Sequence, residues 1–270
     1  MSFDPKSPIT HRSVLTIAVP IMLSNVSEPM IGVVNTAVIG RLPEPYYIGA
    51  VSLASVIFAF IFWGFGFLRL STGGLSAQAV GKQDAQEAVP VLIRALMIAL
   101  AAGVALLLPP LIRDMAFDFM GGSAEVRLHG ETYFNWRIWS APFALANYCF
   151  LGWFAGQARA GLAFTVQLFL NLTNMALSVL FVLGLGMTSD GVGLAALLAE
   201  ISAALLGGTI AFLVLKRMSA HLDWAGWNGG RLREAATMSI SGLSSPVSGR
   251  GHGTQAKLGG ATILIVKLHD

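Results

Sequence analysis

The stretch LAFTVQLFLNLTNMALSVLFVLGLG, residues 162–186, decides the fold because it is apolar, uncharged and long. The uncharged run that contains it extends from Ala160 to Ser189. A helix needs roughly 20 apolar residues to cross a bilayer, so this run is long enough. Four of its polar side chains share one helix face, within an arc of roughly 60° at about 100° per residue. They are Gln167, Asn171, Asn174 and Ser178.

Such a polar stripe has two interpretations. Polar side chains at membrane depth are costly unless they face protein or a water-filled cavity. The stripe therefore either forms hydrogen bonds that hold helices together or lines a cavity. The residues alone leave both interpretations open.

The composition is that of an integral membrane protein. Hydrophobic residues make up 55% and charged residues 11% of the 270, and the mean hydropathy is +0.69. Soluble domains carry about 25% charged residues. We therefore expect an all-α polytopic membrane protein whose main partner is the lipid bilayer. The net charge of +3 gives no indication of a nucleic-acid partner, and the single cysteine excludes a disulfide framework or a thiolate metal cluster.

The apolar runs predict a bundle of six transmembrane helices over residues 14–217. The runs cover residues 14–40, 48–81, 95–112, 138–158, 160–189 and 191–215. Pro20 and Pro29 are expected to bend the first helix because a proline ring removes an internal hydrogen bond. The polar segment 113–131 is expected to be a loop. Residues 1–13 form a short polar N-terminus, and the Gly- and Ser-rich tail 218–270 is expected to be disordered or aberrant.

The basic residues in the loops predict the orientation, because Lys and Arg gather on the cytoplasmic side. Nine would be cytoplasmic if the N-terminus is inside, and three would be external. The nine are Lys6, Arg12, Lys82, Arg94, Arg159, Lys216, Arg217, Arg231 and Arg233, and the three are Arg41, Arg113 and Arg127. We therefore expect both termini on the cytoplasmic side of the plasma (inner) membrane.

Polar groups within the apolar runs are the candidate functional residues. No metalloprotease, serine-hydrolase or Walker motif occurs, so no catalytic residue is assigned and an enzyme ranks last. No metal site or cofactor is expected either. The predicted substrate and ion pathway combines the stripe with polar residues of three other helices: Glu28, Asn35, Arg137, Asn147 and Glu200. In the structural alternative these groups pair with one another, or Arg137 reaches to the membrane interface.

Four stretches resemble one family of transporters. They are AVPIMLSNVSEPMIGVVNTAVIGRL (18–42), FLRLSTGGLSAQAVGKQD (67–84), RIWSAPFALANYCFLGWFAGQ (137–157) and NLTNMALSVLFVLGL (171–185). In order and spacing they resemble the DinF-like branch of the MATE (multidrug and toxic compound extrusion) transporters, over roughly residues 10–218.

The resemblance implies a fold and a function. Members of the family have twelve helices in two six-helix bundles around a central cavity, and they export organic cations or amphiphilic drugs in exchange for H⁺ or Na⁺. This chain resembles the N-terminal bundle (the N-lobe) alone, so we expect a half-length, truncated antiporter. Its partner would be a second six-helix bundle or a second copy, and without one the stripe is expected to lack an opposite wall.

Two departures from the family pattern concern ion coupling. Asn35 stands where the family usually has an aspartate, in Val-Asp-Thr-Ala, and Ser178 stands in a second acidic position. Glu28 is then a candidate to carry the exchanged proton, with Glu200 as its competitor. The alternative functions are a non-transporting remnant or assembly partner, and a lipid-linked oligosaccharide flippase of related design.

Overall fold

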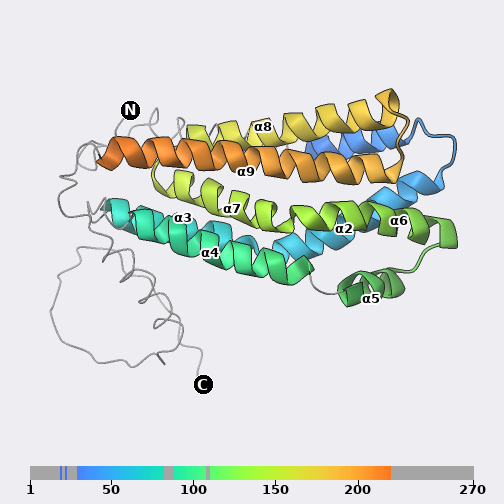
Figure 1. Ribbon diagram of the computed structural model, residues 1–270, viewed down its shortest axis with the longest axis horizontal. Helices are drawn as coiled ribbons and strands as arrows, with labels where there is room; N and C mark the ends of the chain where they lie inside the picture. Colours follow the sequence, from blue (N-terminus) through green and yellow to red (C-terminus); the bar gives the residue numbers. More distant parts are fainter. Residues whose placement is uncertain (1–18, 20–21, 23–28, 82–87, 108–109, 220–270) are drawn as a thin grey trace, which may run out of the picture. The chain divides into compact units, whose positions relative to one another are not determined.

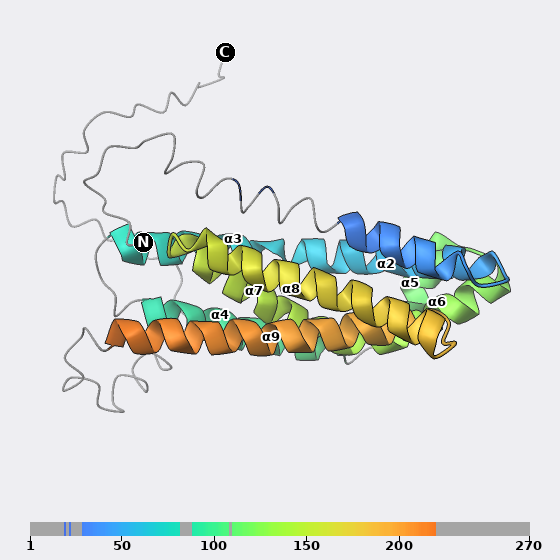
Figure 2. The same ribbon diagram turned by 90° about the horizontal axis from the view of Figure 1, so that it is seen from above.

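The chain folds into helices that run alongside one another (Figures 1 and 2). The computed structural model describes residues 29–81, 88–107 and 110–219, with Val19 and Met22 placed singly. These residues all belong to the first of two compact units, Met1–Asn228. After a first helical segment, Pro29–Ile39, the elements are α2 (Tyr46–Gly64), α3 (Gly66–Gly81), α4 (Ala88–Leu107), α5 (Pro110–Met120), α6 (Ala124–Arg137), the 3₁₀ turn η1 (Ile138–Ser140), α7 (Ala141–Gly156), α8 (Ala160–Val179), the π-helical turn η2 (Leu180–Gly184) and α9 (Ser189–Ser219).

The all-α fold class and its membrane character are confirmed. Within the described ranges, four helical segments are long and apolar enough to cross a bilayer: Tyr46–Gly81, Ala88–Leu107, Ala160–Gly184 and Ser189–Arg217. Two predicted spans remain. Residues 14–40 are described only in part. Residues 138–158 contain α7, whose 16 residues are fewer than the roughly 20 that cross a bilayer. The tail 220–270 lies outside the described residues.

The prediction of a loop at residues 113–131 is wrong, because helices α5 and α6 occupy most of it. Only a tight turn separates them, where Gly121 and Gly122 adopt φ values of +71° and +131° that favour glycine. The next residue, Ser123, caps α6 by accepting a hydrogen bond from the backbone N–H of Val126 at 3.3 Å. The glycine turn and the serine cap therefore start a helix within a segment whose composition is polar.

Charged residues stabilise this helical corner outside the membrane-spanning segments. The pKa of Glu125 is lowered, first by a hydrogen bond from its own backbone and then by one from Ser123. Arg127 Nε donates to Glu131 Oε1 one turn away at 2.8 Å, and its guanidinium also pairs with Asp118 of α5. Both pairs raise the pKa of Arg127, and the pair with Asp118 connects α6 to α5.

The central column of the bundle is the helical segment that runs through α6, η1 and α7. Its first part packs against α2 and α9, and its second part packs against α3, α4, α8 and α9. Eleven of the 16 residues of α7 are buried. A helix that is apolar all round belongs in the interior, which explains why α7 is surrounded by the others.

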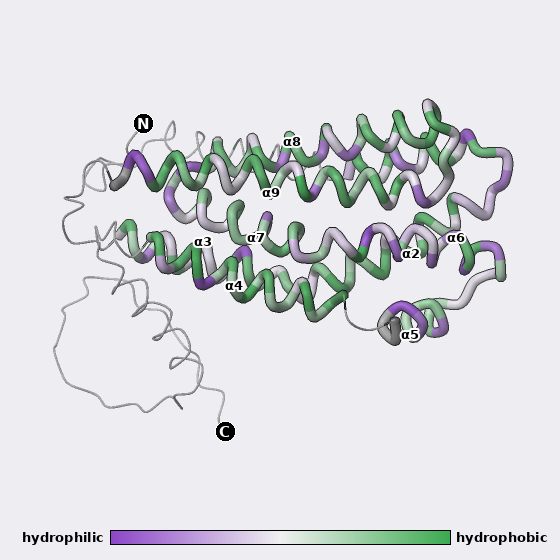
Figure 3. The backbone as a smooth tube through the Cα atoms, viewed as in Figure 1, coloured by the Kyte–Doolittle hydropathy of each residue, from purple (hydrophilic) through white to green (hydrophobic). Residues whose placement is uncertain are grey.

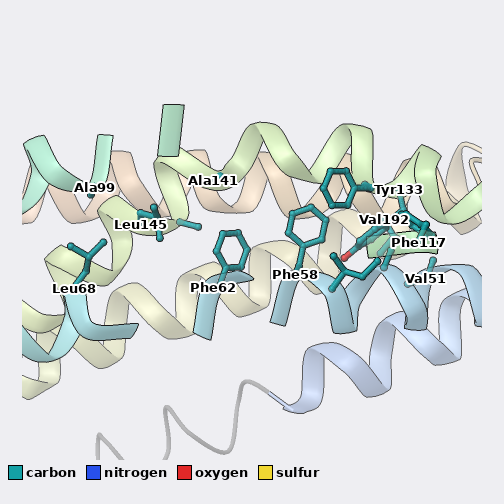
Figure 4. Close-up of a cluster of buried hydrophobic side chains, with 14 of the residues drawn as sticks. Val51, Phe58, Phe62, Leu68, Ala99, Phe117, Tyr133, Ala141, Leu145 and Val192 are labelled. Carbon is teal, nitrogen blue, oxygen red and sulfur yellow. The ribbon is translucent and has the colours of Figure 1, made fainter. Parts of the chain in front are cut away.

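Two clusters of buried side chains hold the helices together. Figure 4 shows the first, in which the ring of Phe58 from α2 lies beside that of Phe62 on the same helix and near that of Tyr133 of α6. The second cluster joins α4, α7, α8 and α9 around Trp153 and Phe154. The indole Nε1 of Trp153 also donates to the backbone oxygen of Ala88 at 2.9 Å, so this buried ring has its polar atom satisfied.

Large apolar side chains cover the outside of the bundle. Trp63, Leu70 and Phe60 on α2 and α3 are 82%, 77% and 70% exposed. Figure 3 shows hydrophobic residues along most of α4 and α9, with hydrophilic residues in α5 and at the end of α9. So much exposed apolar surface is typical of a protein whose helices face lipid.

Candidate functional site

The polar stripe of α8 faces the interior of the bundle. Asn171, Asn174 and Ser178 are 0%, 3% and 0% exposed, and Gln167 is half-buried. Gln167 Nε2 donates to Asn171 Oδ1, one turn along the helix, at 3.1 Å. The expectation that the stripe of one bundle lacks an opposite wall is therefore wrong, because the chain's own helices cover it. Among these, α7 and α9 pack against α8.

A second polar contact joins α7 to α9. Asn147, which is 2% exposed, donates through Nδ2 to Glu200 Oε2 at 2.7 Å and to the Glu200 backbone oxygen at 3.1 Å. The short distance to the carboxyl oxygen is typical of a hydrogen bond to a charged group. Two residues that the sequence analysis assigned to one pathway are thus in direct contact, although 53 positions separate them.

Among the described residues, buried side-chain oxygens without a hydrogen-bond partner occur on the first helical segment, on α7 and on α8. They are Asn35 Oδ1, Asn147 Oδ1, Asn174 Oδ1 and Ser178 Oγ. Leaving a buried polar group unpaired costs about 1–3 kcal/mol, so each such atom calls for an explanation. All four oxygens can accept hydrogen bonds, which suits a region that water, a cation or a polar substrate enters.

Arg137, the last residue of α6, lies against aromatic rings. Its guanidinium carbon is 5.2 Å from the ring centre of Phe58 and 5.9 Å from those of Phe62 and Tyr133. A cation at these distances is attracted by the ring faces. The Nε atom of Arg137 is buried and unpaired. The aromatic rings therefore hold the guanidinium between α6 and α2.

Some predicted residues lie outside the part of the chain that the structure describes. These are Glu28 and Pro20, so neither the proton-carrier role of Glu28 nor the bend at Pro20 is tested. Pro29 and Asn35 lie in the segment Pro29–Ile39. Within the described ranges, no group of three or more His, Cys, Asp or Glu side chains is placed to hold a metal ion.

Helix α7 approaches α3 closely at two of its glycines. A Cβ atom added at Gly152 would lie 2.3 Å from the backbone oxygen of Arg69. One added at Gly156 would lie 2.3 Å from the backbone oxygen of Gly73 and 2.6 Å from Ser76 Cβ. The G-x-x-x-G spacing of these two glycines is the signal that indicates such a contact.

Comparisons with known proteins agree with this architecture. The MatE family model matches residues 20–180, which is 161 of the 270 residues. The DNA damage-inducible protein F of Escherichia coli (strain K12) is 36% identical over 224 residues, which cover 82% of this chain and 49% of that protein. The chain thus spans about half the length of this curated relative.

Solved structures show the same fold. A MOP superfamily transporter from Pyrococcus furiosus superposes with a TM-score of 0.69 at 22% identity, over 75% of this chain and 45% of its own. A multidrug resistance MATE family transporter in an outward-facing conformation gives the same score and identity over 76% and 45%. By the extent of the family match, this chain belongs to the MatE family, in its DinF-like branch, and it corresponds to the N-terminal half of the MATE transporter fold.

Proposed function

We propose that this chain supplies one half of a MATE-type exporter of small organic substrates, of the cationic or amphiphilic kind. The observation that carries the proposal is the row of buried polar side chains on α8, two of whose oxygens, on Asn174 and Ser178, have no hydrogen-bond partner. Helix-to-helix hydrogen bonding alone does not account for oxygens that bond to nothing. Family membership supports a transport role for these residues.

The transport cycle we propose is antiport, with H⁺ or Na⁺ as the coupling ion. Substrate would pass along the polar side chains of the first helical segment, α7, α8 and α9 while one bundle moves against another. Export by a single bundle is not expected, because alternating access requires a second one. That bundle is either a complementary six-helix chain or another copy of this chain.

Two other functions are weighed against this proposal. A non-transporting remnant would have no use for unpaired polar groups in the membrane, where each is costly. A flippase for lipid-linked oligosaccharides would need free basic side chains for the diphosphate. Arg137 is instead held over the rings of Phe58, Phe62 and Tyr133. Neither alternative is favoured.

The test is dye efflux from cells that lack their own multidrug pumps. The chain is expressed alone, and together with a complementary six-helix bundle from a DinF-like relative. We expect energy-dependent efflux of a fluorescent organic cation only with the second bundle, and loss of efflux in an Asn174→Leu/Ser178→Leu variant. A matched Leu172→Ala variant, changed on the exposed side of α8, should retain efflux. Equal efflux by the stripe variant would contradict the proposal.

A further inference from the structure

Helix α5, which lies outside the four described spans, exposes apolar side chains where a helix in water would expose charged ones. Phe119 is 92% exposed and Met115 is 61% exposed. At about 100° per residue, both point roughly 160° away from Phe117, which is buried. The charged residues of α5 lie within roughly 70° of Phe117 or less on either side of it at the same angular step. They are Arg113, Asp114 and Asp118.

The charged side of α5 is attached to α6, the helix beside it in Figure 1. Arg113 Nη1 donates to Asn135 Oδ1 of α6 at 3.0 Å, and Asp118 pairs with Arg127 of α6. Asp114 accepts from the guanidinium of Arg113 at 2.9 Å. Each charged side chain of α5 thus has a polar partner, which lowers the cost of placing it in a medium less polar than water. These contacts also fix which side of α5 faces away from the bundle.

The position of α5 along the bundle places it close to a membrane surface. The span α4 ends at Leu107 and α5 begins at Pro110, and three residues of chain reach at most about 11 Å. Asn135, the partner of Arg113, is followed by Trp136 and Trp139, which are 42% and 58% exposed. Exposed tryptophans are typical of the boundary between membrane and water. The start of α5 therefore lies at the level of this boundary.

We propose that the apolar face of α5, formed by Met115 and Phe119, is inserted into the boundary between the headgroups and the acyl chains of the bilayer. Interfacial amphipathic helices bury such a face by about 5–10 Å. The preceding span, α4, likewise exposes apolar side chains, with Leu100 at 58% and Val104 at 45%. The lipid surface of α4 then continues onto α5.

The area of this face favours lipid over a protein partner. A stable protein interface buries about 800 Å² on each partner. A phenylalanine buries about 150–250 Å², so Met115 and Phe119 together supply roughly half of the area required. A bilayer requires no minimum area of this kind, because it already surrounds the spans. The proposal does not depend on what the bundle transports.

The test is spin labelling of single cysteines in a Cys149→Ala chain, reconstituted in liposomes alone and together with a complementary six-helix bundle. Labels at Met115→Cys and Phe119→Cys are compared with a lipid reference, Leu100→Cys on α4, and a water reference, Glu44→Cys, an exposed residue before α2. Collisions with O₂ report contact with acyl chains, and collisions with a water-soluble nickel chelate report contact with water. In both preparations, we expect the ratio of O₂ to nickel collisions at positions 115 and 119 to approach that at position 100 and to exceed that at position 44.

Two results would overturn the proposal. A ratio at positions 115 and 119 equal to that at position 44 would show that the face lies in water. Low access to both reagents, in either preparation, would show that a second copy or the added bundle covers it. All four substituted side chains are exposed. Each variant should therefore unfold at the same temperature as the Cys149→Ala chain, and this measurement separates a change of environment from a loss of the fold.

Discussion

Replacing Gly152 with alanine should destabilise the bundle, because α7 touches α3 at that point through its backbone. The added Cβ would lie 2.3 Å from the Arg69 backbone oxygen, whereas an ordinary contact begins at 3.4 Å. The helices would therefore have to separate by about 1.1 Å, which is the difference between 3.4 Å and 2.3 Å. Overpacking of this kind costs about 1–3 kcal/mol in unfolding free energy. Gly156→Ala, with 2.3 Å to the Gly73 oxygen, should cost a similar amount.

A matched control lies on the facing helix. A Cβ at Gly74 of α3 would meet nothing within 4 Å, so Gly74→Ala should gain about 0.5–1 kcal/mol from the better helix propensity of alanine. The assay is thermal unfolding of the purified chain in detergent, followed by tryptophan fluorescence. If Gly152→Ala and Gly156→Ala unfold at the same temperature as Gly74→Ala, the close contact of α3 and α7 is not part of the native bundle.

Three further predictions concern single contacts and the orientation. Ser123→Ala removes the cap of α6, which should raise the pKa of Glu125 toward its ordinary value in an NMR titration. Because the pKa of Glu125 is lowered in the folded state, this carboxylate stabilises the fold at pH values above its unfolded-state pKa. That stabilisation is lost as the pH falls through the folded-state pKa. If the pKa of Glu125 is unchanged in Ser123→Ala, the cap does not have this role. Trp153→Phe removes the hydrogen bond to the Ala88 oxygen and should lower the unfolding free energy by about 1 kcal/mol in the same thermal assay; an unchanged midpoint would contradict it. Reporter fusions after Lys82, Arg159 and Met218 should show a cytoplasmic location, and fusions near Pro45, Ser123 and Ser189 an external one; an external report at Met218 would overturn the orientation.

The parts of the fold that the sequence predicted are those governed by local pattern. The uncharged run from Ala160 predicted α8 and its continuation in η2, and the 3.6-residue period predicted that Asn171, Asn174 and Ser178 share a face. Their common burial follows from that pattern. The sequence analysis did not predict helices α5 and α6, because the many charged side chains of this segment favoured a loop. The turn at Gly121 and the cap at Ser123 were therefore not recognised. A polar composition indicates exposure to water and does not exclude a helix.

The parts of the site that the sequence did not predict depend on packing between distant segments. Asn147 and Glu200 were each expected in a pathway, but their pairing depends on how α7 and α9 meet. The same holds for Arg137, whose aromatic neighbours come from α2 as well as from α6. The stripe was expected to face a missing bundle, and the structure shows instead that this chain's own helices enclose it. A helix pattern identifies a polar face and leaves the element that covers it unspecified.

The central claim is that the stripe on α8 belongs to a water-accessible path and does more than hold helices together. Thiol labelling tests it most directly. In a Cys149→Ala background, single cysteines replace Asn174 and Ser178 in the stripe, and Leu172 and Val179 on the exposed side of the helix. The chain is reconstituted in liposomes with a complementary bundle and treated with a charged thiol reagent. We predict labelling at positions 174 and 178, reduced by an organic cation, with none at 172 and 179; unlabelled stripe positions would contradict the claim.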